Sequence, residues 1–172
     1  MKNLLWLLGI IALVAVSGVI FIYSGTYNIS ATVPHNALTH WIMSTTMDNS
    51  VKHHAKNIVV PDLSDSSKIK MGFVHYRAMC VSCHGAPGVS QEELAAGLYP
   101  KPPKLVRTIH EWTPAELFWI TKYGVKMTGM PAWGPTHSDD KIWAMVAFME
   151  KMQKMTPEQY KNLDIELKKD QD

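Results

Sequence analysis

Two cysteines and a histidine stand together in Cys80-Val81-Ser82-Cys83-His84, and these are the only cysteines in the chain. Two residues between the thiols place them about one helical turn apart, so both can reach the two vinyl groups of one porphyrin. His84 follows directly, which brings its imidazole beneath the centre of the same ring. The spacing predicts one covalently attached haem c, with Cys80 and Cys83 in the thioether bonds and His84 as an iron ligand.

Two other uses of paired cysteines fit this sequence less well. A zinc ribbon needs a second pair of ligands, and no further cysteine exists. A thioredoxin-like redox dithiol lies near alternating strands and helices, and the chain shows no such pattern. Haem attachment is therefore the favoured interpretation of Cys80 and Cys83.

A second iron ligand is expected from the Gly- and Pro-rich loop that begins at Met127. A methionine thioether is a soft ligand that suits haem iron and raises its potential relative to a second imidazole. Met130 is the better candidate, because Gly129 lets the backbone approach the ring and Pro131 restricts the next turn. Met127 is the alternative ligand. The chain has eleven methionines, and most are expected to fill the core.

The order of several residues around these motifs resembles that of class I cytochromes c. The resemblance is carried by Gly72, Tyr76, Cys80-x-x-Cys83-His84-Gly85, Pro103-x-Leu105 and Gly129-Met130-Pro131-Ala132-Trp133. It covers residues 62–155, a little over half of the chain. It implies a class I cytochrome c haem domain. Together with the uncharged N-terminal run described below, the predicted fold class is all-α, with this domain preceded by one N-terminal transmembrane helix.

The resemblance also implies the roles of individual residues at the iron. His84 is then the proximal ligand and Met130 the distal ligand. The backbone carbonyl of Pro103 is expected to accept a hydrogen bond from the other nitrogen of His84. Such a bond fixes the orientation and the basicity of a ligating imidazole. The loop between Gly85 and Lys101 matches nothing in the family pattern.

Helical patterns account for the rest of this domain, and no alternating strand pattern occurs. A first helix is predicted from about Ser66 to Val81. Two helices cross closely only where a side chain is missing, and the resemblance implies that Gly72 and Tyr76 meet Phe148 on the last helix of the domain.

Capping signals mark the later helices. Thr113-Pro114-Ala115-Glu116 is a capping box that begins a helix ending at about Tyr123. Ser138 is the predicted N-cap of a helix that runs to about Lys154. Its apolar stripe consists of Ile142, Met145, Val146 and Met149. A second capping box at Thr156 begins a final polar helix within residues 156–172.

The N-terminus predicts a membrane anchor over residues 1–27. Leu4 through Tyr23 carries no charge and is long enough to cross a bilayer as one helix. Lys2 precedes this run, and no Lys or Arg follows until Lys52, so the remainder of the chain is expected outside the cytoplasm. With the family resemblance, this implies a single-pass protein of the bacterial inner (cytoplasmic) membrane with its haem domain in the periplasm. A cleaved signal peptide is the alternative.

Residues 28–61 are predicted to link the anchor to the haem domain, yet they are not rich in Gly, Ser, Pro or charge as a flexible tether is. Leu38, Trp41, Ile42 and Thr45 recur at helical spacing. One hypothesis is an amphipathic helix that docks on the membrane surface or on a partner subunit. The other hypothesis is that this segment folds back over the haem domain.

The charge of the chain points toward protein partners. A net charge of +2 is too small to imply nucleic acid. The segment around the predicted haem is locally basic, and such a rim would steer the domain toward an acidic patch on a redox partner. An ordinary solvated surface is the alternative. The basic residues are Lys101, Lys104, Arg107, Lys122 and Lys126.

A haem with both axial positions filled favours an electron carrier, and no catalytic motif suggests an enzyme. An electron carrier needs redox partners, and the expected ones are a quinol-oxidising complex, a periplasmic dehydrogenase or a terminal oxidase. One alternative is a haem enzyme or gas sensor with a displaceable sixth ligand. Another is a docking subunit of a larger respiratory complex.

Overall fold

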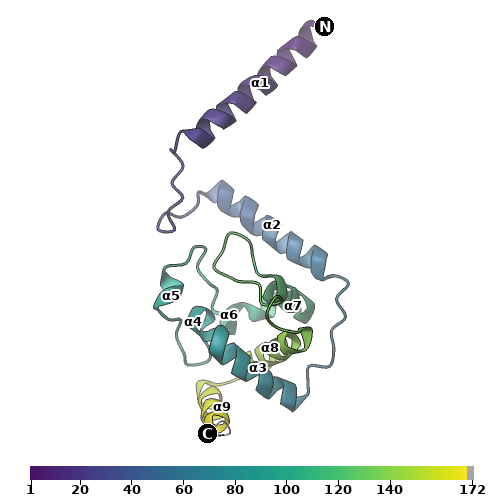
Figure 1. Cartoon of the computed structure of the whole chain (residues 1–172), viewed down its shortest axis with the longest axis vertical. Coiled ribbons are helices and arrows are strands. Elements are labelled where there is room, and N and C mark those ends of the chain that lie inside the picture. The colour runs from purple at the N-terminus through teal and green to yellow at the C-terminus, as the bar shows by residue number, and fades with distance from the viewer. Residues whose placement is uncertain (170–172) are drawn as a thin grey trace. The chain divides into compact units, whose positions relative to one another are not determined.

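The computed structural model describes residues 1–169, and the side chains of residues 1–167, as an all-helical chain. In that part of the chain the only extended pairing is a bridge between Ala86 and Val89. The elements are α1 (Lys2–Tyr23), α2 (Ala37–Ala55), α3 (Ser66–Met79), α4 (Val81–His84), α5 (Glu93–Ala96), α6 (Leu105–Thr108), a 3-10 turn (Ile109–Glu111), α7 (Pro114–Tyr123), α8 (Asp139–Met152) and α9 (Pro157–Lys169) (Figure 1).

The chain divides after Val33 into two compact units. The first unit contains α1, in which every residue is exposed. This helix is long and apolar enough to cross a membrane, and no other helix within residues 1–169 is. At its end, the Ser24 backbone N–H donates to the Ile20 carbonyl at 2.9 Å and the Ser24 hydroxyl donates to the Phe21 carbonyl at 2.7 Å. The predicted divisions at residues 27, 61 and 155 stay predictions.

The second unit is built around the crossing of α3 and α8 (Figure 1). A Cβ at Gly72 would overlap the carbonyl group of Ala144 and lie 2.9 Å from Cβ of Phe148. The missing side chain is therefore what lets the two backbones approach. Tyr76 lies on the same face of α3, with its ring centroid 5.3 Å from that of Phe148. The predicted meeting of Gly72 and Tyr76 with Phe148 is confirmed.

α8 is buried more completely than its sequence pattern predicts. The pattern indicates an apolar stripe, but every residue from Ile142 to Met149 is buried. The reason is that α8 has neighbours on several sides: α3 crosses it, and Trp143 stacks on Phe118 of α7 at 4.1 Å between ring centroids. Ser138 is the N-cap as predicted, although its side chain makes no capping hydrogen bond. The helix ends at Met152, two residues before the predicted end.

The predicted capping box at Thr113 is present at the start of α7. The Thr113 backbone N–H donates to Glu116 at 2.7 Å, and the Glu116 backbone N–H donates to the Thr113 hydroxyl at 3.4 Å. These bonds satisfy two donors that the first turn of a helix leaves free. α7 ends before Gly124, as the sequence predicts.

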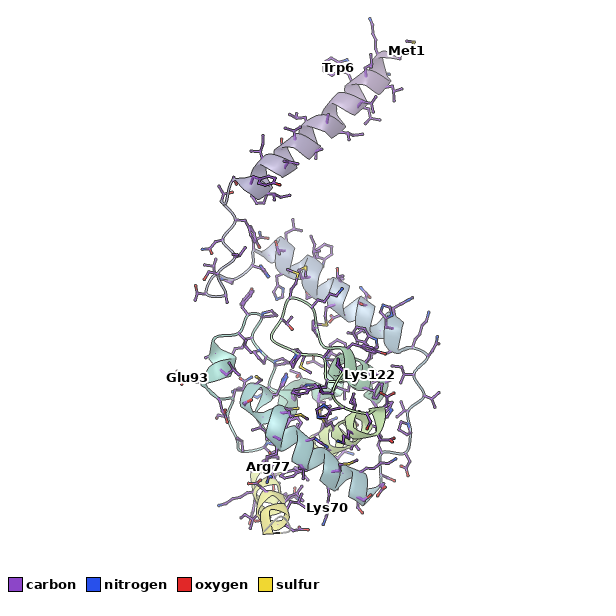
Figure 2. All side chains as sticks on the ribbon, viewed as in Figure 1. Met1, Trp6, Lys70, Arg77, Glu93 and Lys122 are labelled. Atoms are coloured by element: carbon purple, nitrogen blue, oxygen red, sulfur yellow. The ribbon has the colours of Figure 1, made fainter. Side chains whose placement is uncertain are left out.

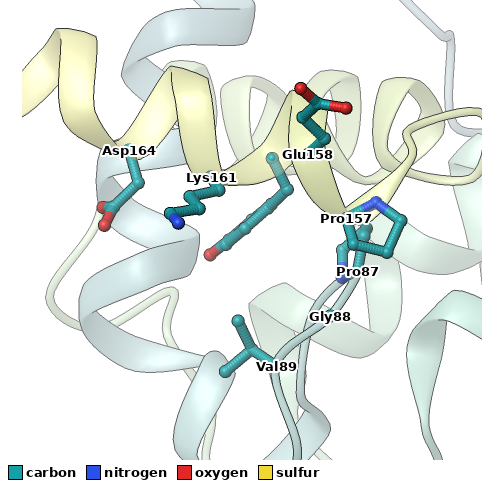
Figure 3. A pocket seen from close by; sticks show the side chains of 8 residues that line it. Pro87, Gly88, Val89, Pro157, Glu158, Lys161 and Asp164 are labelled. Atoms are coloured by element: carbon teal, nitrogen blue, oxygen red, sulfur yellow. The ribbon is translucent and has the colours of Figure 1, made fainter.

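α9 is more than the polar tail that its sequence predicts. Its capping box at Thr156 is present, and Tyr160 and Leu167 are buried in the core. Two ion pairs join α9 to α3, with Arg77 and Lys70 on the α3 side (Figure 2). Figure 3 shows an open groove between α9 and the loop that contains Gly88 and Val89. None of Cys80, Cys83, His84 and Met130 lines this groove.

α2 folds back on its own domain through its C-terminal half. Val51 and Ala55 are buried, and His54 stacks on Trp119 of α7 at 5.5 Å between ring centroids. The segment before α2 is held as well, because the His35 backbone N–H donates to the Tyr99 hydroxyl at 2.8 Å. The N-terminal half keeps apolar side chains exposed, at 64% for Leu38, 62% for Trp41 and 46% for Ile42. The C-terminal half of α2 therefore covers the domain, while the N-terminal half carries exposed apolar side chains that fit the docking hypothesis.

Candidate haem site

The cysteine-histidine motif lies on a tight turn between two helices. α3 ends at Met79, and α4 contains Cys83 and His84. The Cys80 carbonyl accepts from both Cys83 N–H at 3.2 Å and His84 N–H at 2.8 Å, which keeps the two cysteines one turn apart. Gly85 then leaves the helix at a φ of 69°, a conformation that favours glycine.

Both cysteines are unpaired thiols, with Cys80 buried and Cys83 half-buried. Burial raises the pKa of the Cys80 thiol to about 12, and the neighbouring Cys83 adds to this shift. The preference for haem attachment over a redox dithiol or a zinc site continues to rest on the C-x-x-C-H spacing.

His84 is oriented through one of its two ring nitrogens. Its Nδ1 lies 2.9 Å from the carbonyl oxygen of Pro103. A carbonyl can only accept, so Nδ1 carries the proton and Nε2 keeps its lone pair. Burial lowers the pKa of the imidazole, and the hydrogen bond to Pro103 offsets part of this shift. His84 is thereby held in the neutral form that can bind a metal.

The loop that carries Met130 is fixed by hydrogen bonds to itself and to the end of α7. The Thr128 hydroxyl donates to the Val125 carbonyl at 2.8 Å and accepts from the Met130 N–H at 3.0 Å. Beyond Met130, the N–H groups of Trp133 and Gly134 donate to the carbonyls of Thr121 and Lys122, respectively. These hydrogen bonds fix the position of the Met130 backbone.

The two methionine candidates lie in different surroundings. Met130 is half-buried, whereas Met127 is 84% exposed and has a φ of 58°. Leu98 packs close to Gly129, where an added Cβ would lie 2.7 Å from Cδ1 of Leu98. The sequence interpretation missed Leu98, since it lies in the loop that matches no family pattern. These surroundings favour Met130 as the ligand.

The comparison with known families decides what this helical unit is. Residues 67–149 match the family model described as cytochrome c oxidase, cbb3-type, subunit III. The chain carries a c-type cytochrome domain. No curated protein matches the chain. The predicted fold class, an all-α cytochrome c domain with one N-terminal apolar helix, is thereby confirmed.

The residues of this cytochrome domain fit a haem by the chemistry of their donor atoms. Two thiols lie one turn apart, an imidazole nitrogen is left free by the Pro103 bond, and a thioether lies on a fixed loop. Cys80, Cys83, His84, Pro103 and Met130 all fall within the matched residues. Their individual roles stay predictions.

Two histidines meet between α3 and the segment before α8. The rings of His75 and His137 are 5.5 Å apart, and His137 also meets Trp133 at 5.5 Å. Partial burial lowers the pKa of His75 below its ordinary value of 6.5, and His137 and Lys141 lower it further. The unfolded cytochrome therefore binds a proton at His75 more readily than the folded one does.

Replacing His75 with glutamine should make the stability of the cytochrome less sensitive to acid. Neutral His75 contributes to the free energy of unfolding above about pH 6.5. This contribution is lost as the pH falls toward the pKa of His75 in the folded protein, which lies below its ordinary value. We expect the decrease in Tm between about pH 7.5 and pH 5.5 to be smaller in His75→Gln than in the wild type. Thermal unfolding at both pH values measures this, with His110→Gln, an exposed site, as the control. If Tm fell by the same amount in His75→Gln as in His110→Gln, His75 would not be the source of the acid sensitivity.

Proposed function

We propose that this cytochrome is anchored in a membrane and carries single electrons between respiratory-chain components through one covalent haem with His/Met ligation. The observation that carries the proposal is the hydrogen bond of His84 to Pro103, which leaves one imidazole nitrogen free beside two unpaired thiols. The family match supports electron transfer as the general role.

Each site residue then has one task. Cys80 and Cys83 would hold the haem through thioether bonds, and His84 and Met130 would bind its iron. The haem supplies a reversible one-electron change at its iron. The backbone hydrogen bonds around Met130 and the Pro103 bond to His84 keep both ligands in place, so little has to move when the electron enters or leaves.

The proposed location is the bacterial inner membrane, with the cytochrome domain on the periplasmic side. α1 would be the anchor, and Lys2 at its start favours a cytoplasmic N-terminus. Anchoring limits diffusion to the membrane plane and raises the effective concentration near membrane partners. Electron donors would be a quinol-oxidising complex or a periplasmic dehydrogenase, and a terminal oxidase would be an acceptor.

The basic rim predicted for partner docking is smaller than the sequence suggests. Lys122, which is labelled in Figure 2, forms an ion pair with Asp139 at 2.6 Å, and its Nζ lies 5.4 Å from the centroid of the Phe118 ring. Its charge is therefore partly compensated within the domain. Lys101 and Lys104 instead line a shallow surface groove. We propose that these two lysines contribute more than Lys122 to steering toward an acidic partner surface.

Absorption spectra of the purified full chain, oxidised and reduced, with and without carbon monoxide, test the proposal. A sulfur-to-iron charge-transfer band and no binding of carbon monoxide are expected for a closed His/Met site. Haem that stays on the denatured polypeptide in a mass spectrum would establish covalent attachment. Ready binding of carbon monoxide without the band would favour the haem enzyme or gas sensor instead.

A permanent subunit of a larger respiratory complex is the second candidate function. The matched family is described as a subunit of a cbb3-type oxidase. The exposed stripe of Leu38, Trp41 and Ile42 on α2 would contact another subunit. At about 100° per residue, these side chains lie about 80° to 180° around the helix from Val51, the side that packs on the cytochrome's own domain.

Replacing Trp41 with alanine tests this second function. If the stripe contacts a subunit, Trp41→Ala should reduce co-purification with partner proteins several-fold, because buried aromatic side chains dominate interface energetics. The haem spectrum and membrane retention should not change. Met43→Ala is the matched control, since Met43 is also exposed on α2 but lies outside the stripe. Unchanged co-purification of Trp41→Ala would leave the free carrier as the preferred function.

A further inference from the structure

The carbonyl that orients His84 lies on a segment poor in hydrogen-bond donors. Pro100, Pro102 and Pro103 have no backbone N–H, so this stretch can be held at those positions only through its carbonyl groups. Residues 101–104 also lie outside any helix. The Pro103 carbonyl therefore needs support from elsewhere if it is to stay 2.9 Å from Nδ1 of His84.

The side chain of Gln91 provides that support. Its Nε2 donates to the Cys83 carbonyl and to the Pro102 carbonyl, both at 2.7 Å, in a partly buried position. A side-chain amide has two N–H groups, so both bonds form at once. Both partners are carbonyl oxygens that can only accept, so the amide nitrogen has to face them.

The residues bridged by Gln91 are neighbours of the residues joined by the histidine bond. Cys83 precedes His84, and Pro102 precedes Pro103, so two parallel bridges connect the haem-binding turn to the proline segment. The backbone next to Gln91 is itself fixed, because the Glu92 N–H donates to the Ser82 carbonyl at 2.8 Å.

We propose that Gln91 is a positioning residue that sets the strength of the bond between His84 and Pro103, and thereby the reduction potential of the cytochrome. This inference rests on the proposed function, in which His84 binds iron. A firm bond from Nδ1 to a carbonyl makes the opposite nitrogen more basic. A more basic ligand stabilises oxidised iron and lowers the potential. Weakening the bond should therefore raise the potential.

The test uses two variants of the full-length haem-loaded chain. Gln91→Leu and Gln91→Met each remove both donors at similar size and add no charge near the iron. We expect both to shift the equilibrium constant of reduction by about tenfold, the lower end of the effect that mutating outer partners of metal ligands has on metal affinity. For a one-electron couple this is a rise of about 59 mV. Exchange of the His84 Nδ1 proton with solvent, followed by NMR, should become faster.

Gln153→Leu is the matched control, because Gln153 is also partly buried but donates only to Glu150 at 3.3 Å. Potentials and proton exchange equal to the wild type in both Gln91 variants would overturn the inference, as would the same changes in the control. In the unaltered chain, the Gln91 side-chain amide should exchange more slowly than that of Gln153, and equal rates would also overturn it. A wild-type spectrum without His/Met features would count against the proposed function, whereas silent Gln91 variants with a normal spectrum would count only against the role of Gln91.

Discussion

Replacing Met130 with alanine should give a reduced cytochrome that binds carbon monoxide and has a lower reduction potential. Removal of the thioether leaves the sixth position of the iron to water or to an added ligand. Loss of a soft ligand that favours reduced iron should lower the equilibrium constant of reduction by at least tenfold, about 59 mV. Carbon monoxide difference spectra and a redox titration measure the two effects.

Met127→Ala is the control for this result, because Met127 lies three residues away in the same loop and is 84% exposed. Its spectrum and potential should equal those of the wild type. If Met127→Ala were instead the variant that binds carbon monoxide, the assignment of the distal ligand would be wrong. The hydrogen bonds of Thr128 involve only the backbone of its partners, so neither substitution removes them.

Replacing Gly72 with alanine should reduce the free energy of unfolding by about 3 kcal/mol, the upper part of the range for overpacking a core. The added Cβ would overlap the Ala144 carbonyl, and that group belongs to backbone, which cannot move aside as a flexible side chain can. α3 and α8 would have to separate, which exposes the tightly packed rings of Phe73, Tyr76 and Phe148. Denaturant unfolding of the haem-loaded chain measures the loss.

Gly97→Ala provides the matched control for the Gly72 substitution. A Cβ at Gly97 would lie 3.8 Å from its nearest neighbour, the Leu94 carbonyl oxygen, and φ is −87° there. This change should leave stability within a few tenths of a kcal/mol or raise it slightly. Equal unfolding midpoints for Gly72→Ala and the wild type would show that α3 and α8 can tolerate a wider crossing.

Features with a local cause could be predicted from the sequence. The capping boxes at Thr113 and Thr156 depend on side chains three residues apart, and both are present. The apolar helix α1 and the absence of strands within residues 1–169 could also be predicted from the sequence. The helix crossing at Gly72 was predicted from the family resemblance. The spacing of residues within one helix does not show which other helix it crosses.

Features that depend on residues far apart in the chain were missed. α9 has few apolar residues, so nothing in its own pattern indicates that Tyr160 and Leu167 reach the core. Gln91 and Leu98 lie in the loop without a family match, and their contacts to Pro102 and Gly129 follow only from how that loop folds. For α2, folding back over the domain was one of two hypotheses, but the spacing did not identify α7 as the helix that it contacts.

The backbone contacts around the two proposed ligands have a consequence for the speed of electron exchange. The Met130 segment is fixed by hydrogen bonds to itself and to the end of α7, and Gln91 donates to the Pro102 carbonyl, next to the Pro103 carbonyl that His84 contacts. If iron lies between His84 and Met130 as proposed, its bond lengths can change little between oxidation states. A small reorganisation energy follows, and it allows an electron to tunnel at a useful rate across a wider gap. Such a cytochrome needs only brief and loosely aligned encounters with its redox partners.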